Sequence, residues 1–103
     1  KMYNIVYLPI ARQDIIEIIT YISDFLKSPQ AALDLLDCLE RSILRLQDFP
    51  YSCKVYQPVK QLTKEYRVMA VKNYLVFYII NDSSKIVEVY RILYARKNLD
   101  LQF

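Results

Sequence analysis

The chain has 103 residues, no histidine, no glycine, two cysteines and a formal net charge of +3. This length suits one domain, which we expect to span residues 1–103. The composition excludes an imidazole acid–base catalyst and a glycine-rich phosphate loop. Two cysteines without metal spacing favour neither a zinc site nor a disulfide framework. We therefore expect no metal, and no small-molecule cofactor.

The opening residues lack the ordered charged, apolar and cleavage regions of a signal peptide. The longest unbroken apolar run, residues 74–80, has seven residues, whereas a membrane-spanning helix needs about 20. We therefore expect a cytoplasmic protein without a membrane partner.

The first half shows a short strand pattern followed by two helical patterns. Residues 3–8 are rich in β-branched and aromatic side chains, which indicates a strand. In residues 10–26 isoleucines recur at helical spacing, which predicts a helix. Ser28 and Pro29 suit the start of a second helix, which ends before Pro50. The link between the helices has two or three residues, which predicts an antiparallel helical hairpin.

The second half begins with a polar, irregular segment, residues 51–63. Three strand patterns follow, in residues 65–72, 74–80 and 85–94, separated by short turns. This spacing predicts a consecutive antiparallel meander. The predicted fold is α+β with the order β-α-α-β-β-β, in which the N-terminal helical hairpin packs on one face of a twisted antiparallel sheet.

Charge is uneven along the chain. Residues 1–48 carry a net charge of −2 and residues 49–103 carry +5. The basic half is a mild indication of a polyanionic partner. Its cations and tyrosines are the candidate functional residues: Lys54, Lys60, Lys64, Arg67, Lys72, Arg91, Tyr94, Arg96 and Lys97.

An arginine interrupts the last strand pattern. Because residues two apart share a face of a strand, Arg91 is predicted to point the same way as Val87, Val89 and Leu93. Arg67 has a similar context in an earlier strand. An arginine on an apolar face requires a partner.

Two kinds of partner fit these arginines. The first is an internal carboxylate, such as that of Glu65 or Glu88. The second is a phosphate, which both arginines would bind in a bidentate manner at one concave surface. Tyr94, three residues after Arg91, lies on the opposite face of a regular strand. It either packs, stacks on a base or moves a proton. The lysines near Arg67 are either solvated charges or an electrostatic rim.

The chain resembles the RelE/ParE superfamily, the toxin halves of type II toxin–antitoxin modules. The resemblance covers nearly the whole chain and rests on "YLPIARQDIIEIITYIS", "SPQAALDLLDCLERSILRLQDFP", "EYRVMAVKNYLVFYII" and "VEVYRILYARKN". It implies the fold derived above, a cognate antitoxin that covers the active face, and a role in plasmid stabilisation.

Two activities occur in the superfamily. RelE-like members cleave mRNA in the ribosomal A site, where cations bind the scissile phosphate and the neighbouring 2′-hydroxyl attacks it. ParE-like members inhibit DNA gyrase and have no known catalytic residues. For the first activity, the resemblance implies catalytic roles for Arg67, Arg91 and Tyr94. Contacts to RNA then fall to Lys54, Lys60, Lys64 and Arg96.

Many relatives have histidine where this chain has Tyr94. Without histidine, the acid–base role falls to Tyr94 or a lysine, or there is no catalysis. The resemblance slightly favours a ribosome-dependent mRNA endonuclease whose partners are the antitoxin, the ribosome and mRNA. The alternative is a non-enzymatic, ParE-like inhibitor of DNA gyrase.

Overall fold

The structure, a computed structural model, describes residues 2–58 and 60–97. Its elements, in chain order, are β1 (Asn4–Tyr7), α1 (Pro9–Thr20), a π-helical turn (Tyr21–Phe25), α2 (Pro29–Leu44), two 3-10 turns (Arg45–Gln47 and Pro50–Ser52), β2 (Arg67–Val71), β3 (Tyr74–Asn81) and β4 (Ile86–Tyr94). The predicted α+β class and the order of one strand, two helices and three strands are confirmed. Within the described ranges, no helix is both long and apolar enough to cross a membrane.

The four strands form one sheet with the order β1-β4-β3-β2. The strands β2, β3 and β4 form the predicted antiparallel meander. β1, however, runs parallel to β4. The sheet is therefore mixed, which corrects the prediction of an antiparallel sheet at this one pair. Short turns set the direction of the meander strands, whereas β1 reaches β4 without a hairpin turn.

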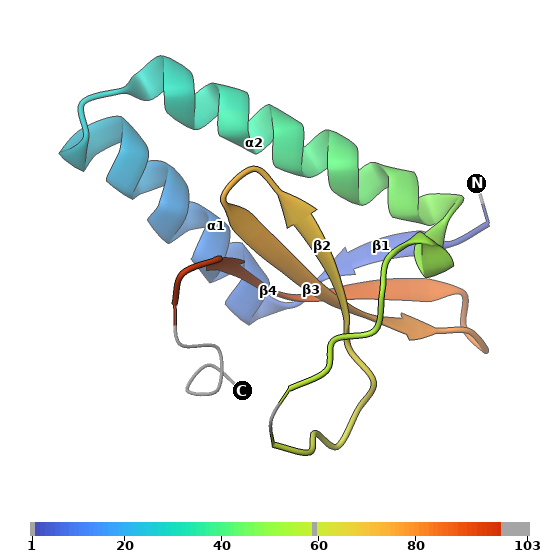
Figure 1. The fold of residues 1–103 in the computed structure, drawn as a ribbon. Coiled ribbons are helices and arrows are strands. Elements are labelled where there is room, and N and C mark those ends of the chain that lie inside the picture. The colour runs from blue at the N-terminus through green and yellow to red at the C-terminus, as the bar shows by residue number, and fades with distance from the viewer. Residues whose placement is uncertain (1, 59, 98–103) are drawn as a thin grey trace.

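The helical hairpin packs on one face of the sheet (Figure 1). There, Leu39 and Ile43 of α2 are buried against sheet residues such as Val76 and Val89. Ala11, which is fully buried, brings α1 close to the same core. A smaller cluster of buried apolar residues, separate from this core, consists of Val68, Phe77 and Leu93.

A β-bulge interrupts β4. Tyr78 pairs with Val89, but Phe77 pairs with Arg91, so Tyr90 is an additional residue in β4. An additional residue shifts the alternation of side chains between the two faces. Val89 therefore belongs to the main core, whereas Leu93 belongs to the smaller cluster. The prediction that Arg91 shares a face with Val87, Val89 and Leu93 is therefore wrong for Val87 and Val89, which belong to the main core, and right for Leu93.

Three turns use lysine in the left-handed backbone region: Lys27, Lys72 and Lys85 have φ values of 56°, 53° and 57°. This region disfavours residues that carry a Cβ atom, and glycine is its usual occupant. The chain has no glycine, so lysines provide these sharp reversals.

Candidate functional site

Arg91 forms an ion pair with Asp14 of α1. Its Nε lies 2.8 Å from Asp14 Oδ2 and its Nη2 lies 2.9 Å from Oδ1. The two side chains are only 13% and 10% exposed. These hydrogen bonds raise the pKa of the Arg91 guanidinium. The internal carboxylate is thus Asp14, and not the Glu65 or Glu88 considered from the sequence.

Asp14 also completes the edge of the sheet. β1 pairs with β4 only as far as Val89, and α1 lies beside the rest of β4. There, Asp14 Oδ2 accepts a hydrogen bond of 3.0 Å from the backbone N–H of Ile92. One carboxylate therefore satisfies both a backbone donor and a guanidinium. The sequence signal for this role is an acid three residues after Ala11 and four before Ile18, both of which contact the core.

Arg67 is also bound within the protein. Its Nη1 donates a hydrogen bond of 2.7 Å to the backbone carbonyl of Cys53. Its Nη2 lies 3.8 Å from Glu65 Oε2, and the guanidinium lies 4.9 Å from the centre of the Tyr51 ring. The Arg67 side chain is 17% exposed. The carboxylate of Glu65, one of the two considered from the sequence, thus lies near Arg67.

The strand register places Arg67 and Arg91 on different faces of the sheet. Arg67 is paired with Tyr78, a main-core residue, whereas Arg91 is paired with Phe77, which belongs to the smaller cluster. Paired residues of antiparallel strands share a face. The two arginines therefore do not line one concave surface.

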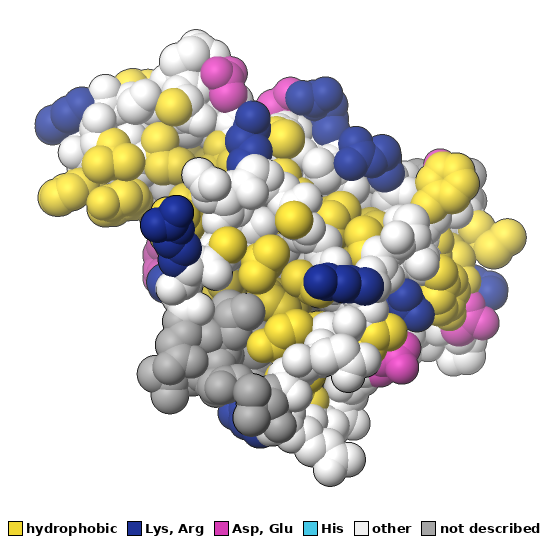
Figure 2. All heavy atoms as spheres, in the orientation of Figure 1, with side chains coloured by type: hydrophobic (Ala, Val, Ile, Leu, Met, Phe, Trp, Pro, Cys, Tyr) yellow, Lys and Arg dark blue, Asp and Glu magenta, His cyan; other side chains and the backbone are white. Residues whose placement is uncertain are grey.

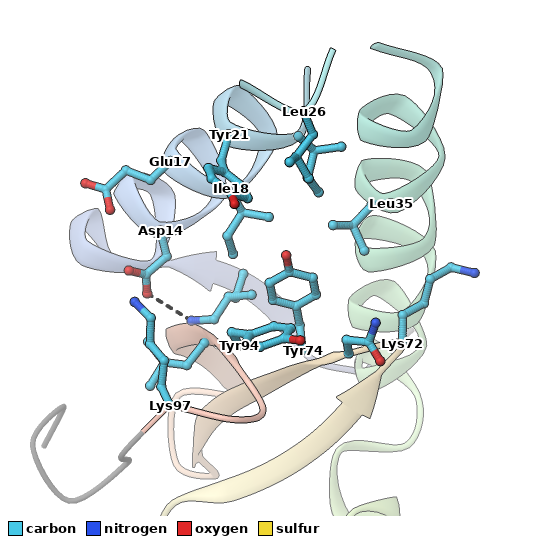
Figure 3. Close-up of a pocket in the computed structure, with 14 residues that line it drawn as sticks. Asp14, Glu17, Ile18, Tyr21, Leu26, Leu35, Lys72, Tyr74, Tyr94 and Lys97 are labelled. Carbon is cyan, nitrogen blue, oxygen red and sulfur yellow. Dashed lines mark hydrogen bonds between the residues drawn. The ribbon is translucent and has the colours of Figure 1, made fainter. Parts of the chain in front are cut away.

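Tyr94 lies in a different place, a cleft of about 790 Å³ between the helical hairpin and the ends of the strands. Figure 3 shows Tyr74 and Tyr94 together, with Ile18 and Leu35 facing them from the two helices. Tyr94 is 38% exposed, and its ring packs edge-on against Tyr74, with ring centres 5.6 Å apart. Burial raises the pKa of Tyr74, and nearby Tyr94 and Tyr21 raise it further. The Tyr74 hydroxyl thus remains a hydrogen-bond donor at neutral pH.

The remaining predicted cations lie on other parts of the surface. Lys54 is exposed, and its carbonyl accepts a hydrogen bond from the N–H of Val68 in β2. Lys60 and Lys64 line a shallow depression of about 340 Å³ in the irregular loop. Arg96 is exposed in the turn after β4. Of the seven residues predicted to be catalytic or to contact RNA, only Tyr94 lines the cleft, and of the wider set of candidates Lys72 and Lys97 line it as well. Residues 2–58 and 60–97 contain no cluster of three acidic, cysteine or histidine side chains suited to a metal.

Residues 5–99 match the sequence profile of the ParE toxin of type II toxin–antitoxin system, parDE. The chain belongs to the ParE toxin family. It is therefore a toxin of a type II toxin–antitoxin system. A comparison of this ParE-family chain with curated protein sequences found no match.

Solved structures share the fold of this ParE-family toxin. A chain of the chromosomal ParDE system from P. aeruginosa is 15% identical, with a TM-score of 0.73 over 92% of this chain and 98% of that one. A chain of the RelBE2 complex from Mycobacterium tuberculosis is 15% identical, with a TM-score of 0.59 over 91% and 99%. A chain of the RelE–RelB complex from Pyrococcus horikoshii is 11% identical, with a TM-score of 0.61 over 94% and 99%. At such low identity, the likeness concerns the fold.

Proposed function

We propose that this toxin is a non-enzymatic, ParE-like inhibitor that acts by binding DNA gyrase. The observation that carries the proposal is the bidentate ion pair between Arg91 and Asp14. A phosphate could bind the Nε and Nη2 groups of Arg91 only by displacing the Asp14 carboxylate, which already accepts hydrogen bonds from both. Leaving one member of a buried ion pair without its partner costs about 3–5 kcal/mol.

The positions of the arginines also argue against RNA cleavage. Stabilising the charge on a cleaving phosphate requires donors that already converge on one point. Arg67 binds the carbonyl of Cys53, and Arg91 binds Asp14 from the other face of the sheet. Tyr94 lies in the cleft, and the chain has no histidine to assist it.

One observation favours the second candidate, a ribosome-dependent mRNA endonuclease. Tyr94 is exposed beside Lys97 in the cleft, and Arg96 is exposed in the same turn. A tyrosine next to cations could stack on a base and hold a phosphate. In that mechanism Arg67, Arg91 and Tyr94 would be catalytic, and a phosphate bound by Nε and Nη2 of Arg91 would have to displace Asp14.

The proposed partner under normal conditions is a cognate antitoxin, because the solved relatives belong to toxin–antitoxin systems. Both candidate targets are components of the cytoplasm, where we place the toxin. Plasmid stabilisation would follow if the module is carried on a plasmid, because cells that lose the module lose the antitoxin.

Two assays on the same purified protein test the proposal. The first measures DNA supercoiling by purified gyrase, and the second maps mRNA 5′ ends in a defined translation reaction with and without ribosomes. We expect inhibition of supercoiling and intact mRNA. Ribosome-dependent cuts with unimpaired supercoiling would overturn the proposal in favour of the endonuclease. The Leu39→Asp variant is the inactive control, because Leu39 is fully buried and its loss disrupts the core.

A further inference from the structure

We infer that the toxin holds gyrase through the face of the sheet opposite the helices, where Glu88 pairs with a lysine or arginine of the gyrase surface. The inference rests on the proposed function, because it names the surface through which gyrase would be inhibited. The strand register brings six residues together on the β1 side of this face, and we call them the open face. They are Asn4, Val6, Ile79, Asn81, Ile86 and Glu88.

The register shows that the open face points away from the helical hairpin. Val6 of β1 and Ile79 of β3 are both paired with Glu88 of β4, and residues paired across neighbouring strands share a face. Val87 and Val89, the two neighbours of Glu88 along β4, are fully buried in the main core beneath the helices. Because successive residues of a strand point to opposite faces, Glu88 and its two paired residues point away from that core.

Apolar side chains of the open face remain partly exposed. On the β2 side of the same sheet face, the irregular loop supplies Tyr56, whose ring packs edge-on against the fully buried Phe77 with ring centres 5.0 Å apart. On the β1 side, Val6 is 39% exposed and Ile79 is half-buried. Neighbouring apolar side chains that stay accessible to solvent are suited to contact with a partner.

Glu88 is the one charged residue of the open face, and it is half-buried. Among residues 2–58 and 60–97, its carboxylate takes part in no hydrogen bond or ion pair. A carboxylate packed between Val6 and Ile79 loses part of its hydration without gaining a partner, which is unfavourable. Proteins retain such unfavourable features mainly at functional sites. A cation from a partner protein would supply the missing counter-charge as water is excluded from the interface.

The charge of Glu88 also argues against other occupants of the open face. A nucleic acid would bring phosphates against the carboxylate. A second copy of the toxin, packed through the same face, would bring a second Glu88. Like charges brought together at an interface oppose binding. A protein surface with a lysine or arginine among apolar residues complements both the carboxylate and the apolar side chains.

Supercoiling by purified gyrase tests the inference, and the readout is the toxin concentration that halves the activity. Glu88→Gln keeps the size of the side chain and removes its charge, so it should raise this concentration about tenfold. Glu88→Lys should raise it further, because the two cations then repel each other. Added salt should reduce the difference between Glu88→Gln and the wild type, since it screens the charge pair.

Two control variants should inhibit gyrase as the wild type does. Glu40→Gln makes the same chemical change at an exposed residue of α2. Phe25→Glu changes a rival apolar surface, because Figure 2 shows hydrophobic side chains gathered at the end of the molecule where the two helices meet. There Phe25 is 72% exposed and stacks on Tyr21, with ring centres 5.1 Å apart.

Urea unfolding separates contact with gyrase from a structural role of Glu88. Because its carboxylate has no partner among the described residues, Glu88→Gln should unfold at a urea midpoint no lower than that of the wild type. A photocrosslinking amino acid locates the contact directly. Val6→p-benzoylphenylalanine should crosslink to a gyrase subunit, whereas the same replacement of Phe25 should not.

Four results would overturn the inference. A folded wild-type toxin that leaves supercoiling unimpaired would refute the proposed function, and this inference with it. Inhibition by the wild type that both Glu88 variants retain would refute this inference alone. Loss of inhibition in Phe25→Glu, with inhibition retained in Glu88→Lys, would place gyrase at the end of the helical hairpin. A fall of the urea midpoint together with inhibition in Glu88→Gln would show that Glu88 has a structural role.

Discussion

The carboxylate of Asp14 lies 2.8 Å from Nε of Arg91, a residue 77 positions later in the chain. The same carboxylate accepts a hydrogen bond from the backbone N–H of Ile92. α1 is thereby joined to β4 through two donors of different kinds. This contact explains how an arginine occurs in a strand pattern that is otherwise apolar.

Asp14→Ala should destabilise the protein by about 3–5 kcal/mol, because it leaves a buried guanidinium without its counter-charge. Urea unfolding measures the loss. The matched control is Asp37→Ala, which breaks the Asp37–Arg41 pair, whose side chains are 66% and 69% exposed. The control should cost less than about 1 kcal/mol. If the two variants lost equal amounts of unfolding free energy, the buried ion pair would contribute no more to stability than the exposed pair, contrary to our expectation.

Replacing both Asp14 and Arg91 should lower the free energy of unfolding by less than replacing only one of them. In Asp14→Leu combined with Arg91→Met, no charge is left without a partner, and the apolar side chains add to the core. The N–H of Ile92 still loses its acceptor, which costs about 1–3 kcal/mol. A double-mutant cycle in urea measures the coupling between the two positions. If the loss of unfolding free energy in the double variant equalled the sum of the losses in the two single variants, the two side chains would not act as a pair.

Tyr78→Phe should destabilise the protein by about 1–3 kcal/mol, because the hydroxyl donates a buried hydrogen bond of 2.7 Å to the carbonyl of Pro50. Burial raises the pKa of Tyr78. The protonated form is therefore favoured in the folded state, and this stabilisation is lost as the pH rises above about 10. Urea midpoints measured across that range should fall less steeply for Tyr78→Phe than for the wild type. Tyr21→Phe, at a half-exposed residue, should retain the steep fall.

Asp82 should contribute to stability in acid. It accepts hydrogen bonds from the Tyr3 hydroxyl and from Lys85 Nζ, and these bonds lower its pKa. A carboxyl with a lowered pKa stabilises the fold above its unfolded pKa, and this contribution is lost as the pH falls below about 4. Asp82→Asn should therefore reduce the acid dependence of the urea midpoint. Asp24→Asn serves as the exposed control. If the urea midpoint of Asp82→Asn fell in acid as steeply as that of the wild type, the hydrogen bonds from Tyr3 and Lys85 to Asp82 would not contribute to stability.

Lys27→Gly should stabilise the protein by about 0.5–1 kcal/mol, because Lys27 has a positive φ at the turn between the helices. Thermal or urea unfolding measures the gain. Lys64 is not among the non-glycine residues with positive φ, so Lys64→Gly should give no gain. A loss of stability in Lys27→Gly would show that the side chain contributes more than the backbone strain costs.

Most of the fold could be predicted from the sequence because its signals are local. Isoleucine and leucine spacing predicted the two helices, and short turns predicted the meander of β2, β3 and β4. The pairing of β1 with β4 depends on residues more than eighty positions apart, such as Asn4 and Ile86. Period-two alternation also assumes a regular strand, so the bulge near Tyr90 could not be predicted from it.

The site was less predictable for the same reason. The carboxylates considered for the two arginines, Glu65 and Glu88, were each close in sequence to one of them, whereas the partner of Arg91 is Asp14, which lies on α1. Arg67 shares the face of Met69 and Val71, as the alternation predicts, since these side chains and that of its pairing partner Tyr78 belong to the main core. A tyrosine-rich cleft could not be predicted, because it forms only when the ends of the strands meet the helical hairpin.

The place of β4 in the sheet has a consequence for synthesis of the toxin. Among residues 2–58 and 60–97, β4 is the last strand, yet it is the neighbour of both β1 and β3. While a ribosome is still making residues before Ile86, β1 has no strand to join and Asp14 has no arginine to bind. β1 therefore has no neighbouring strand until β4 has been synthesised. A chain cut short before Ile86 would therefore lack the strand that unites the fold, so toxicity should appear only when translation has passed that point.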